Sequence, residues 1–290
     1  MLNPSNLSFS TASLAGHSIP AAARVGWDMG FRSIELLAFD GYRHSQGDLA
    51  GFYFDRMNAT EREALREVVA PFDSVSTHAP FIDMPLLAPN PGLKAAAVAQ
   101  LETAITATAF LGGSTTTAHV PGKSGYTLEE AWPEILATFR ALGDCAGEAG
   151  VTLTIETGYP VGVDLFAQLI HDIDHPAVGA NIDVGHLVGY IAPDLRGTEE
   201  GAAVCRETLT AQLDALGEKV YHFHLHDLRL ADFRDHRACG RGYLDYVAIM
   251  RWCRDASFTG VWAFELEEPD IVPALAESKA VIERAIAAVL

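Results

Sequence analysis

The stretch VYHFHLHD, Val220–Asp227, carries a histidine at every second position. Side chains alternate across a β-strand, so one face of this strand presents three imidazoles and the other presents Tyr221, Phe223 and Leu225. The apolar face suits packing against helices, and the imidazole face suits the interior of a closed sheet. Buried strands normally fill such positions with Val or Ile, so the pattern points to a chemical role. The three histidines are His222, His224 and His226.

Similar β-rich runs recur along the whole chain, and amphipathic Ala- and Leu-rich segments separate them. The eight expected strands are 7–14, 33–39, 74–80, 114–121, 151–158, 178–186, 220–227 and 260–268. The clearest helical segments are 60–70, 93–111, 127–149, 163–173, 197–217, 244–256 and 273–290. Thr60 with Glu63, and Thr127 with Glu130, are predicted capping boxes at two helix starts.

Eight strand–helix units within 290 residues predict an α/β fold with one (β/α)₈ TIM barrel, so that residues 1–290 form a single domain. A doubly wound sheet would normally have five or six strands. It would also carry a glycine-rich phosphate-binding fingerprint after its first strand, which this sequence lacks.

Ligand-type residues lie near the C-terminal ends of the expected strands, on their inner faces, where barrel enzymes hold their active sites. One buried histidine could be ordinary packing, but a buried carboxylate without a partner is costly. Several such residues converging from successive strands predict a bound divalent metal. Mixed imidazole and carboxylate ligands favour Zn, Mn, Fe or Co over Mg or Ca, with Zn, Mn and Co foremost. The residues are His78, His119, Glu156, Asp183, His224 and Glu265.

Seven short stretches carry a family resemblance by their order and their placement on strands three to eight. They are THAPF at His78, AHVPG at His119, IETGYP at Glu156, NIDVGHLVGY at Asp183 and His186, HLHD at His224, DHRACGRG at His236 and FELEE at Glu265. Together they resemble the xylose isomerase-like TIM-barrel superfamily over nearly the whole chain. That superfamily includes endonuclease IV, sugar and sugar-phosphate isomerases and epimerases, and inosose dehydratases.

The resemblance implies roles for these residues. Glu156, Asp183, His224 and Glu265 would hold the common metal, with Glu156 and Glu265 also acting as catalytic acid/base groups. His78 and His119, with Glu156, would match a second metal site of the endonuclease, and His186 and His236 part of a third. The third site also uses an aspartate two residues before its second histidine. Here that position is Arg234, and Asp235 is one place away. The G-E-G of the family is Gly240-Arg241-Gly242 in this chain, a further departure.

The first functional hypothesis is a metal-dependent isomerase or epimerase of a small sugar, sugar phosphate or related polyol or keto compound. A metal-stabilised enediolate and proton transfer by the two glutamates would perform the reaction. The alternative is an endonuclease IV-like zinc phosphodiesterase, acting as an AP endonuclease, which the presence of both His78 and His119 favours. A dehydratase or lyase on the same barrel and an inactive binding subunit are further alternatives.

The loop after the seventh expected strand has four arginines within thirteen residues: Arg229, Arg234, Arg237 and Arg241. They form either a solvated loop paired with Asp227, Asp232 and Asp235 or an anion clamp for a substrate phosphate or carboxylate. In the second interpretation Arg234 and Arg241, together with His226 at the strand end, contact the substrate.

Composition and charge limit the classes of binding partner and the cellular location that we expect. A net charge of −18 argues against nucleic acid and leaves a small-molecule substrate, which the arginines would allow to be anionic. No apolar run of 18 residues occurs, so no membrane span is expected, and the first residues do not read as a secretory signal. Four cysteines without metal-site spacing favour reduced thiols and a cytoplasmic location. A homo-oligomer is compatible with the sequence.

Overall fold

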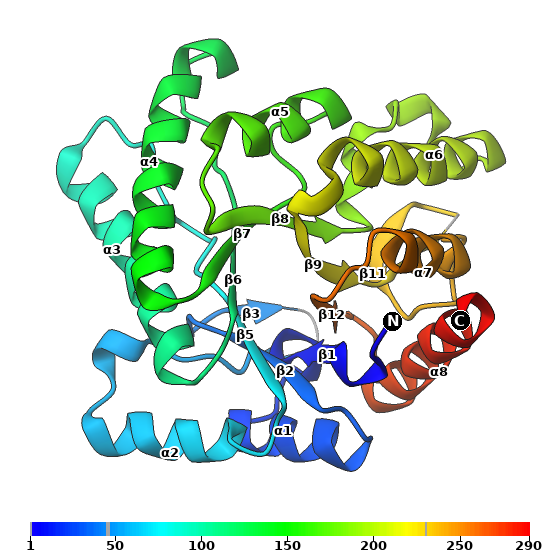
Figure 1. Ribbon diagram of the computed structural model, residues 1–290, viewed down its shortest axis with the longest axis horizontal. Helices are drawn as coiled ribbons and strands as arrows, with labels where there is room; N and C mark the ends of the chain where they lie inside the picture. The colour runs from blue at the N-terminus through cyan, green and yellow to red at the C-terminus, as the bar shows by residue number, and fades with distance from the viewer. Residues whose placement is uncertain (1, 45–46, 230) are drawn as a thin grey trace.

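The computed structural model describes residues 2–44, 47–229 and 231–290, and its central feature is a closed barrel of parallel strands (Figure 1). The order around the barrel is β1-β12-β9-β8-β7-β6-β5-β2, so strands that follow one another along the chain also pair. The predicted (β/α)₈ barrel is therefore confirmed. The barrel strands are β1 Leu7–Ser10, β2 Ser33–Leu37, β5 Ser74–His78, β6 Thr115–Ala118, β7 Thr152–Glu156, β8 Val178–Asp183, β9 Val220–Leu225 and β12 Val261–Phe264.

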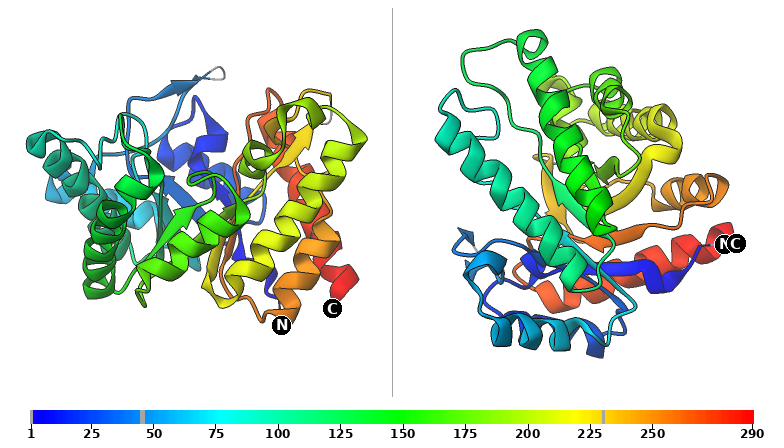
Figure 2. Two further views of the ribbon diagram at one scale, coloured as in Figure 1. Left: turned by 90° about the horizontal axis from the view of Figure 1, so that it is seen from above. Right: turned by 60° about the vertical axis from the view of Figure 1, so that its left-hand side comes forward.

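An outer layer of helices surrounds the strands (Figures 1 and 2). The α-helices are α1 Ile19–Asp28, α2 Ala59–Val69, α3 Pro91–Phe110, α4 Leu128–Ala149, α5 Val163–Ile173, α6 Glu199–Leu216, α7 Tyr246–Asp255 and α8 Ile271–Val289. Short 3₁₀ turns are η1 Pro4–Asn6, η2 Thr11–Leu14, η3 Phe54–Arg56, η4 His186–Tyr190, η5 Pro193–Leu195 and η6 Gly217–Lys219. Two small antiparallel pairs lie outside the barrel: β3 Arg43–His44 with β4 Gly47–Asp48, and β10 Asp227–Arg229 with β11 Arg234–Arg237.

Helix α1 and one capping box differ from the sequence-based expectations. Helix α1 was not among the predicted segments, because its buried side is made of Ala22, Ala23 and Gly26 and shows little apolar periodicity. A Cβ at Gly26 would lie 2.0 Å from the Phe9 ring, so the helix approaches the barrel closely there.

The first predicted capping box was wrong by two residues. Helix α2 is capped by Asn58, whose side chain accepts from the Glu61 amide while Glu61 accepts from the Asn58 amide. The second box, Thr127 with Glu130, is confirmed at the start of α4.

The barrel separates an apolar layer from a polar interior. Side chains such as Phe9, Phe223 and Trp262 fill the space between strands and helices and are fully buried. The inner faces instead carry buried hydroxyl and amide groups, including a Thr117–Thr154 contact of 3.0 Å between hydroxyl oxygens. No helix among the described residues is long and apolar enough to cross a membrane. The four cysteines are free thiols.

Candidate active site

The four residues assigned to a metal converge at the C-terminal end of the barrel. Glu156 ends β7, Asp183 ends β8, His224 lies on β9, and Glu265 follows β12 directly. One side-chain ligand atom from each lies within 4.8 Å of the others. His224 Nδ1 is 3.0 Å from Glu265 Oε2, 3.4 Å from Glu156 Oε2 and 3.8 Å from Asp183 Oδ2. We call these four residues the ligand quartet.

The carboxylates and the imidazole of the ligand quartet stabilise each other's charged forms. Burial opposes ionisation of Glu156, but the imidazoles of His119 and His224 hold the pKa of its carboxyl well below its usual range. Burial also opposes a charge on His224, but Glu35, Glu156 and Glu265 raise the pKa of that imidazole well above its ordinary value. The carboxylates of Glu156, Asp183 and Glu265 around Nδ1 of His224 therefore favour a positive charge there, carried by a proton or by a metal ion.

Asp183 shows that the quartet fits a metal ion. Its Oδ1 accepts hydrogen bonds from the backbone amides of Gly185 at 2.9 Å and His186 at 2.8 Å, and lies 2.8 Å from His226 Nε2. Its buried Oδ2 forms no hydrogen bond with the described residues. Neither does His224 Nδ1, whose contacts with Glu156 and Glu265 are ion pairs. A divalent cation would satisfy both atoms, and the donor set suits Zn, Mn or Co.

His78 and His119 lie beside the quartet, as a shared second site requires. His78 Nε2 is 3.2 Å from Glu156 Oε2, and His119 Nε2 is 3.4 Å from the same oxygen. The Nδ1 of His78 lies 2.8 Å from the Ala79 carbonyl oxygen. If Nδ1 donates this hydrogen bond, the lone pair of the neutral ring is on Nε2, where it could bind a metal ion. These two histidines and Glu156 form a second group of potential ligands.

A third group contains Asp183, His226 and His236. His226, expected at the strand end near substrate, is fully buried and stacks on His236 with ring centroids 4.3 Å apart. His186 instead turns toward the quartet, with Nδ1 3.1 Å from Glu156 Oε1. Asp235 takes the place beside His236, with Oδ1 3.2 Å from its Nδ1, although it is shifted by one residue along the chain.

Glu35 was missed by the sequence analysis. It lies in the middle of β2, is fully buried, and contacts His222 and His224. The signal was present, since alternation places Glu35 on the same face as Ser33, and a charged residue at the centre of a buried strand is unusual. The other inward positions of β2 are Ser33 and Leu37, so the strand lacks the His, Asp or Glu near its C-terminal end that marks the other site strands.

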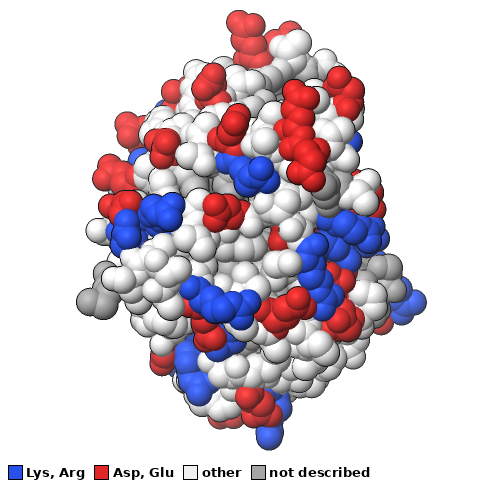
Figure 3. All heavy atoms as spheres, turned by 90° about the vertical axis from the view of Figure 1, so that its right-hand side faces the viewer, with Lys and Arg blue, Asp and Glu red and all other residues white. Residues whose placement is uncertain are grey.

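The arginines of the loop after β9 are paired with carboxylates. Arg234 Nη2 lies 3.3 Å from Glu267 Oε2. Arg241 lies between Asp270 and Glu277, each with an oxygen 2.8 Å from Nη2. Arg229 pairs with Asp232 and Arg237 with Glu268. On the face drawn in Figure 3, basic side chains accordingly lie beside acidic ones. These partners neutralise the charges that an anion clamp would need.

A cavity of about 200 Å³ reaches the quartet at Glu156 and Glu265. Aromatic side chains, histidines and glutamates dominate its wall, and no Lys or Arg occurs among the described lining residues. The side chains include Phe39, Tyr42, Phe81, His78, His119, Glu156, His186, His236, Glu265 and Glu267. Its size matches a molecule of a few carbons, smaller than the 300–1,000 Å³ typical of sites for drug-sized ligands.

Comparison with known proteins finds a matching family and related barrels. A family model described as xylose isomerase-like TIM barrel matches residues 22–288. A search of curated proteins returns no match.

Solved structures with the same fold cover almost the whole chain. A D-tagatose 3-epimerase-like protein has 17% identity and a TM-score of 0.74, covering 98% of this chain and 97% of that one. A D-psicose 3-epimerase from Clostridium cellulolyticum H10 has 13% identity and a TM-score of 0.73, covering 98% and 99%. A xylose isomerase-like TIM barrel protein from Mycobacterium smegmatis, in complex with magnesium, has 17% identity, a TM-score of 0.72 and full coverage of both chains.

Proposed function

Because the chain belongs to the xylose isomerase-like TIM barrel family, we propose that it is a metal-dependent isomerase or epimerase of a small polyhydroxylated carbonyl compound. The observation that carries the proposal is the ligand quartet, in which two glutamates, an aspartate and a histidine meet, and whose two glutamates line a small cavity. Structural neighbours that are sugar epimerases are consistent with it.

Glu156, Asp183, His224 and Glu265 would hold the metal, which when bound would polarise neighbouring carbonyl and hydroxyl oxygens of the substrate. Zn, Mn or Co fits this donor set best. The surrounding histidines, His78, His119, His186 and His236, line the cavity and would orient the hydroxyl groups of the substrate.

Glu156 and Glu265 would perform the proton transfers. The pKa of each carboxyl lies below its usual range, against burial, because imidazoles surround it. Each is therefore ionised before reaction and able to accept a proton from the carbon next to the carbonyl. The glutamate on the opposite face would take up a proton from solvent during the reaction and give it to carbon, while the first glutamate releases the abstracted proton to solvent. Return to the same carbon inverts its configuration. Return to the neighbouring carbon, with transfer of the hydroxyl proton to the former carbonyl oxygen, moves the carbonyl.

The wall of the cavity favours an uncharged substrate over a phosphorylated one. Glu156, Glu265 and Glu267 are among the described lining residues, which contain no Lys or Arg, and the nearby Arg234 is paired with Glu267. A phosphate dianion would meet carboxylates without a free guanidinium to offset its charge. We therefore assign the chain to unphosphorylated sugars or polyols with a carbonyl group.

The test is exchange with solvent deuterium. Metal-loaded protein is incubated in D₂O with ketopentoses, ketohexoses and their phosphates, and deuterium entry at the carbon next to the carbonyl is followed by NMR together with the products. Unphosphorylated substrates should exchange and yield epimers or isomers, whereas loss of water would identify a dehydratase. Exchange of phosphorylated substrates alone would contradict the assignment.

Glu156→Gln keeps the side-chain volume and removes the base. Turnover should fall by at least about 10²-fold, the lower bound for general acid–base catalysis, while circular dichroism reports an intact barrel. Glu207→Gln, at an exposed position on α6, is the matched control and should keep full activity. Near-wild-type turnover of Glu156→Gln would show that the assigned role is wrong.

A zinc phosphodiesterase acting on abasic-site DNA is a second candidate. The observation in its favour is the pair of additional histidine groups, His78–His119–Glu156 and Asp183–His226–His236, which a one-metal sugar enzyme does not need. Metal analysis separates the candidates. One metal per chain with sugar exchange supports the first, and two or three zinc ions with cleavage of abasic-site DNA support the second.

A further inference from the structure

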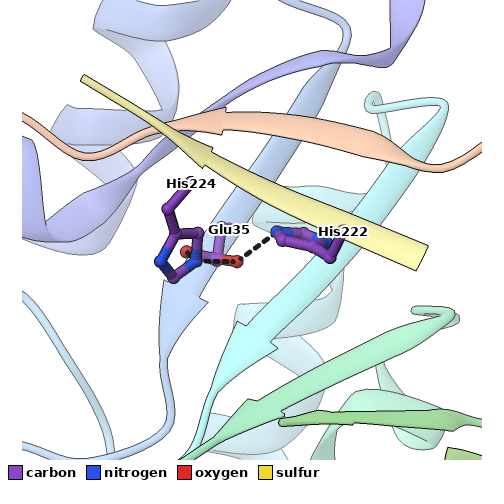
Figure 4. A group of neighbouring side chains, drawn as sticks. All are labelled: Glu35, His222 and His224. Carbon is purple, nitrogen blue, oxygen red and sulfur yellow. Dashed lines mark hydrogen bonds and ion pairs between the residues drawn. The ribbon is translucent and has the colours of Figure 1, made fainter. Parts of the chain in front are cut away.

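A second cluster lies deeper in the barrel, next to the ligand quartet. Glu35 of β2 lies between two imidazoles of β9 (Figure 4). Glu35 Oε2 is 3.0 Å from His222 Nε2. His224 Nε2 lies 3.2 Å from Glu35 Oε1 and forms a hydrogen bond of 3.4 Å with Oε2. The Ser76 hydroxyl donates to Glu35 Oε2 at 3.2 Å. All of these side chains are at most 1% exposed.

The cluster needs an explanation because a buried carboxylate is costly to retain. Glu35 has no Lys or Arg partner among the described contacts, so two imidazoles and one hydroxyl must offset its charge. A packed apolar side chain in this position would normally give a barrel of equal or greater stability. The contact with His224, a member of the ligand quartet, indicates what the carboxylate does.

The two nitrogens of His224 face different partners. Nε2 faces Glu35, whereas Nδ1 faces Glu265 and Glu156 at 3.0 and 3.4 Å. A neutral imidazole has one N–H and one lone pair, and the group that accepts the N–H decides which nitrogen has the lone pair. With the proton held on Nε2 by Glu35, the lone pair is on Nδ1 and points into the quartet.

We propose that Glu35 is a positioning residue for the metal centre, which holds the proton of His224 on Nε2 and thereby presents Nδ1 as the metal ligand. The inference rests on the proposed metal-dependent function. His222 completes the arrangement, since its Nε2 lies 3.0 Å from Oε2 of Glu35 and limits rotation of the carboxylate.

A separate metal ion held by Glu35, His222 and His224 is the competing arrangement, since their ligand atoms also lie within 4.8 Å of one another. Such an ion would occupy the lone pair of His224 Nε2. His224 could then serve the quartet only after losing both ring protons. One proton between Glu35 and Nε2 satisfies both clusters without that cost.

The experiment compares manganese binding by wild-type protein and Glu35→Gln. An amide can donate to Nε2 and so shift the proton to Nδ1, where it opposes the metal. The apparent Kd for Mn²⁺, measured by titration with electron paramagnetic resonance detection of free ion, should rise about 10- to 100-fold, the usual effect of losing such a carboxylate. Glu102→Gln, exposed on α3, is the matched control and should bind as the wild type does.

A second measurement does not depend on how well the variant folds. In wild-type protein loaded with diamagnetic Zn²⁺, ¹⁵N-correlated NMR of the His224 ring should show the proton on Nε2. The signal is assigned by its loss in His224→Gln.

The possible outcomes distinguish failure of the metal centre from failure of the positioning role of Glu35. Absence of saturable manganese binding by wild-type protein would overturn the metal centre and this inference together. Three results would overturn the positioning role and leave the metal centre standing. The first is equal Mn²⁺ binding by folded Glu35→Gln, and the second is a proton on Nδ1 of His224 in the wild type. The third is that Glu35→Gln loses one of two bound metal ions while the other is unaffected.

Discussion

At the scale of the residue, His224 connects the two buried clusters and sets how the site responds to pH. Its pKa is raised well above the ordinary value of imidazole because, against burial, Glu35, Glu156 and Glu265 favour its charged form. Below that raised pKa a metal ion must displace a proton from the ring before it can bind.

The apparent affinity for Mn²⁺ or Zn²⁺ should therefore increase with pH throughout the range below the raised pKa and level off above it. Displacement of one proton gives a slope of about tenfold per pH unit. Calorimetric titrations between pH 6 and pH 9, in buffers of different ionisation enthalpy, measure both the slope and the protons released. An affinity that is flat over this range, with no proton release, would contradict the charge assignment of His224.

Strand alternation predicts that the quartet residues point inward together with His78 and His119, and the choice of these four as metal ligands follows from the family resemblance. Glu156 and Asp183 end their strands, and His224 pairs in register with both Asp183 and Ala263. The grouping of His226 with His236 could not be predicted in this way. It depends on a hairpin in which His236 adopts a positive φ of 56° and its amide donates to His226 Nδ1 at 2.9 Å.

At the scale of the element, the β10–β11 hairpin and the segment after it are organised by the buried carboxylate of Asp227. Its Oδ1 accepts from the amides of Leu228 and Leu244, and its Oδ2 accepts from those of Gly240 and Gly242. A Cβ at Gly242 would lie 2.2 Å from Asp227 Oδ1, so the chain approaches the carboxylate as closely as only glycine allows.

Asp227→Ala should destabilise the protein by at least about 2 kcal/mol, because each buried amide left without a partner costs about 1–3 kcal/mol. Urea denaturation measures the loss, and hydrogen exchange should increase in peptides covering residues 238–244. Asp232→Ala removes an exposed pair with Arg229 and should cost no more than about 1 kcal/mol. Equal effects of the two substitutions would refute the organising role of Asp227.

The starts of α2 and α4 show how well a capping-box motif predicts where a helix begins. Thr127 and Asn58 are both followed three residues later by glutamate, and both form capping boxes. Thr60 with Glu63 has the same spacing but lies inside helix α2, because the chain enters the helix two residues earlier. Overlapping motifs of equal local quality are distinguished by where the preceding turn places the backbone.

At the scale of the whole molecule, the ligand quartet joins four neighbouring strands of the closed barrel. Glu156, Asp183, His224 and Glu265 belong to β7, β8, β9 and the end of β12, which follow one another around the sheet. A metal bound there would connect half of the barrel, and it would bind the folded chain in preference to the unfolded one.

Metal binding should therefore raise the thermal stability of the entire barrel. At a free metal concentration of 100 times Kd, the folded state gains about 2.7 kcal/mol. For a chain of 290 residues this corresponds to an increase in Tm of roughly 4 °C. Calorimetry with and without a chelator measures the change, and Asp183→Asn should abolish most of it. An identical Tm in both conditions would argue against a metal site in the barrel.

The barrel as a whole was predictable because eight β-rich runs and the helices between them leave few alternatives at this chain length. The pairing of the arginines was predicted only in part. Asp232 was expected to pair in this loop, but Arg241 is held by Asp270 and Glu277, which follow β12 and lie far along the chain. Such contacts arise from the closure of the barrel, which brings the ends of different strands together.

The ligand quartet is carried by the strand ends, whereas Tyr42 and Phe81, which line the cavity that reaches it, lie in connecting loops. A mutation at either aromatic residue changes the shape of the entrance and leaves the register of the strands untouched. Natural selection can therefore act on substrate choice and on the ligand geometry as separate traits. Descendants of this protein could therefore evolve a new substrate specificity through their loops while the reaction centre stays unchanged.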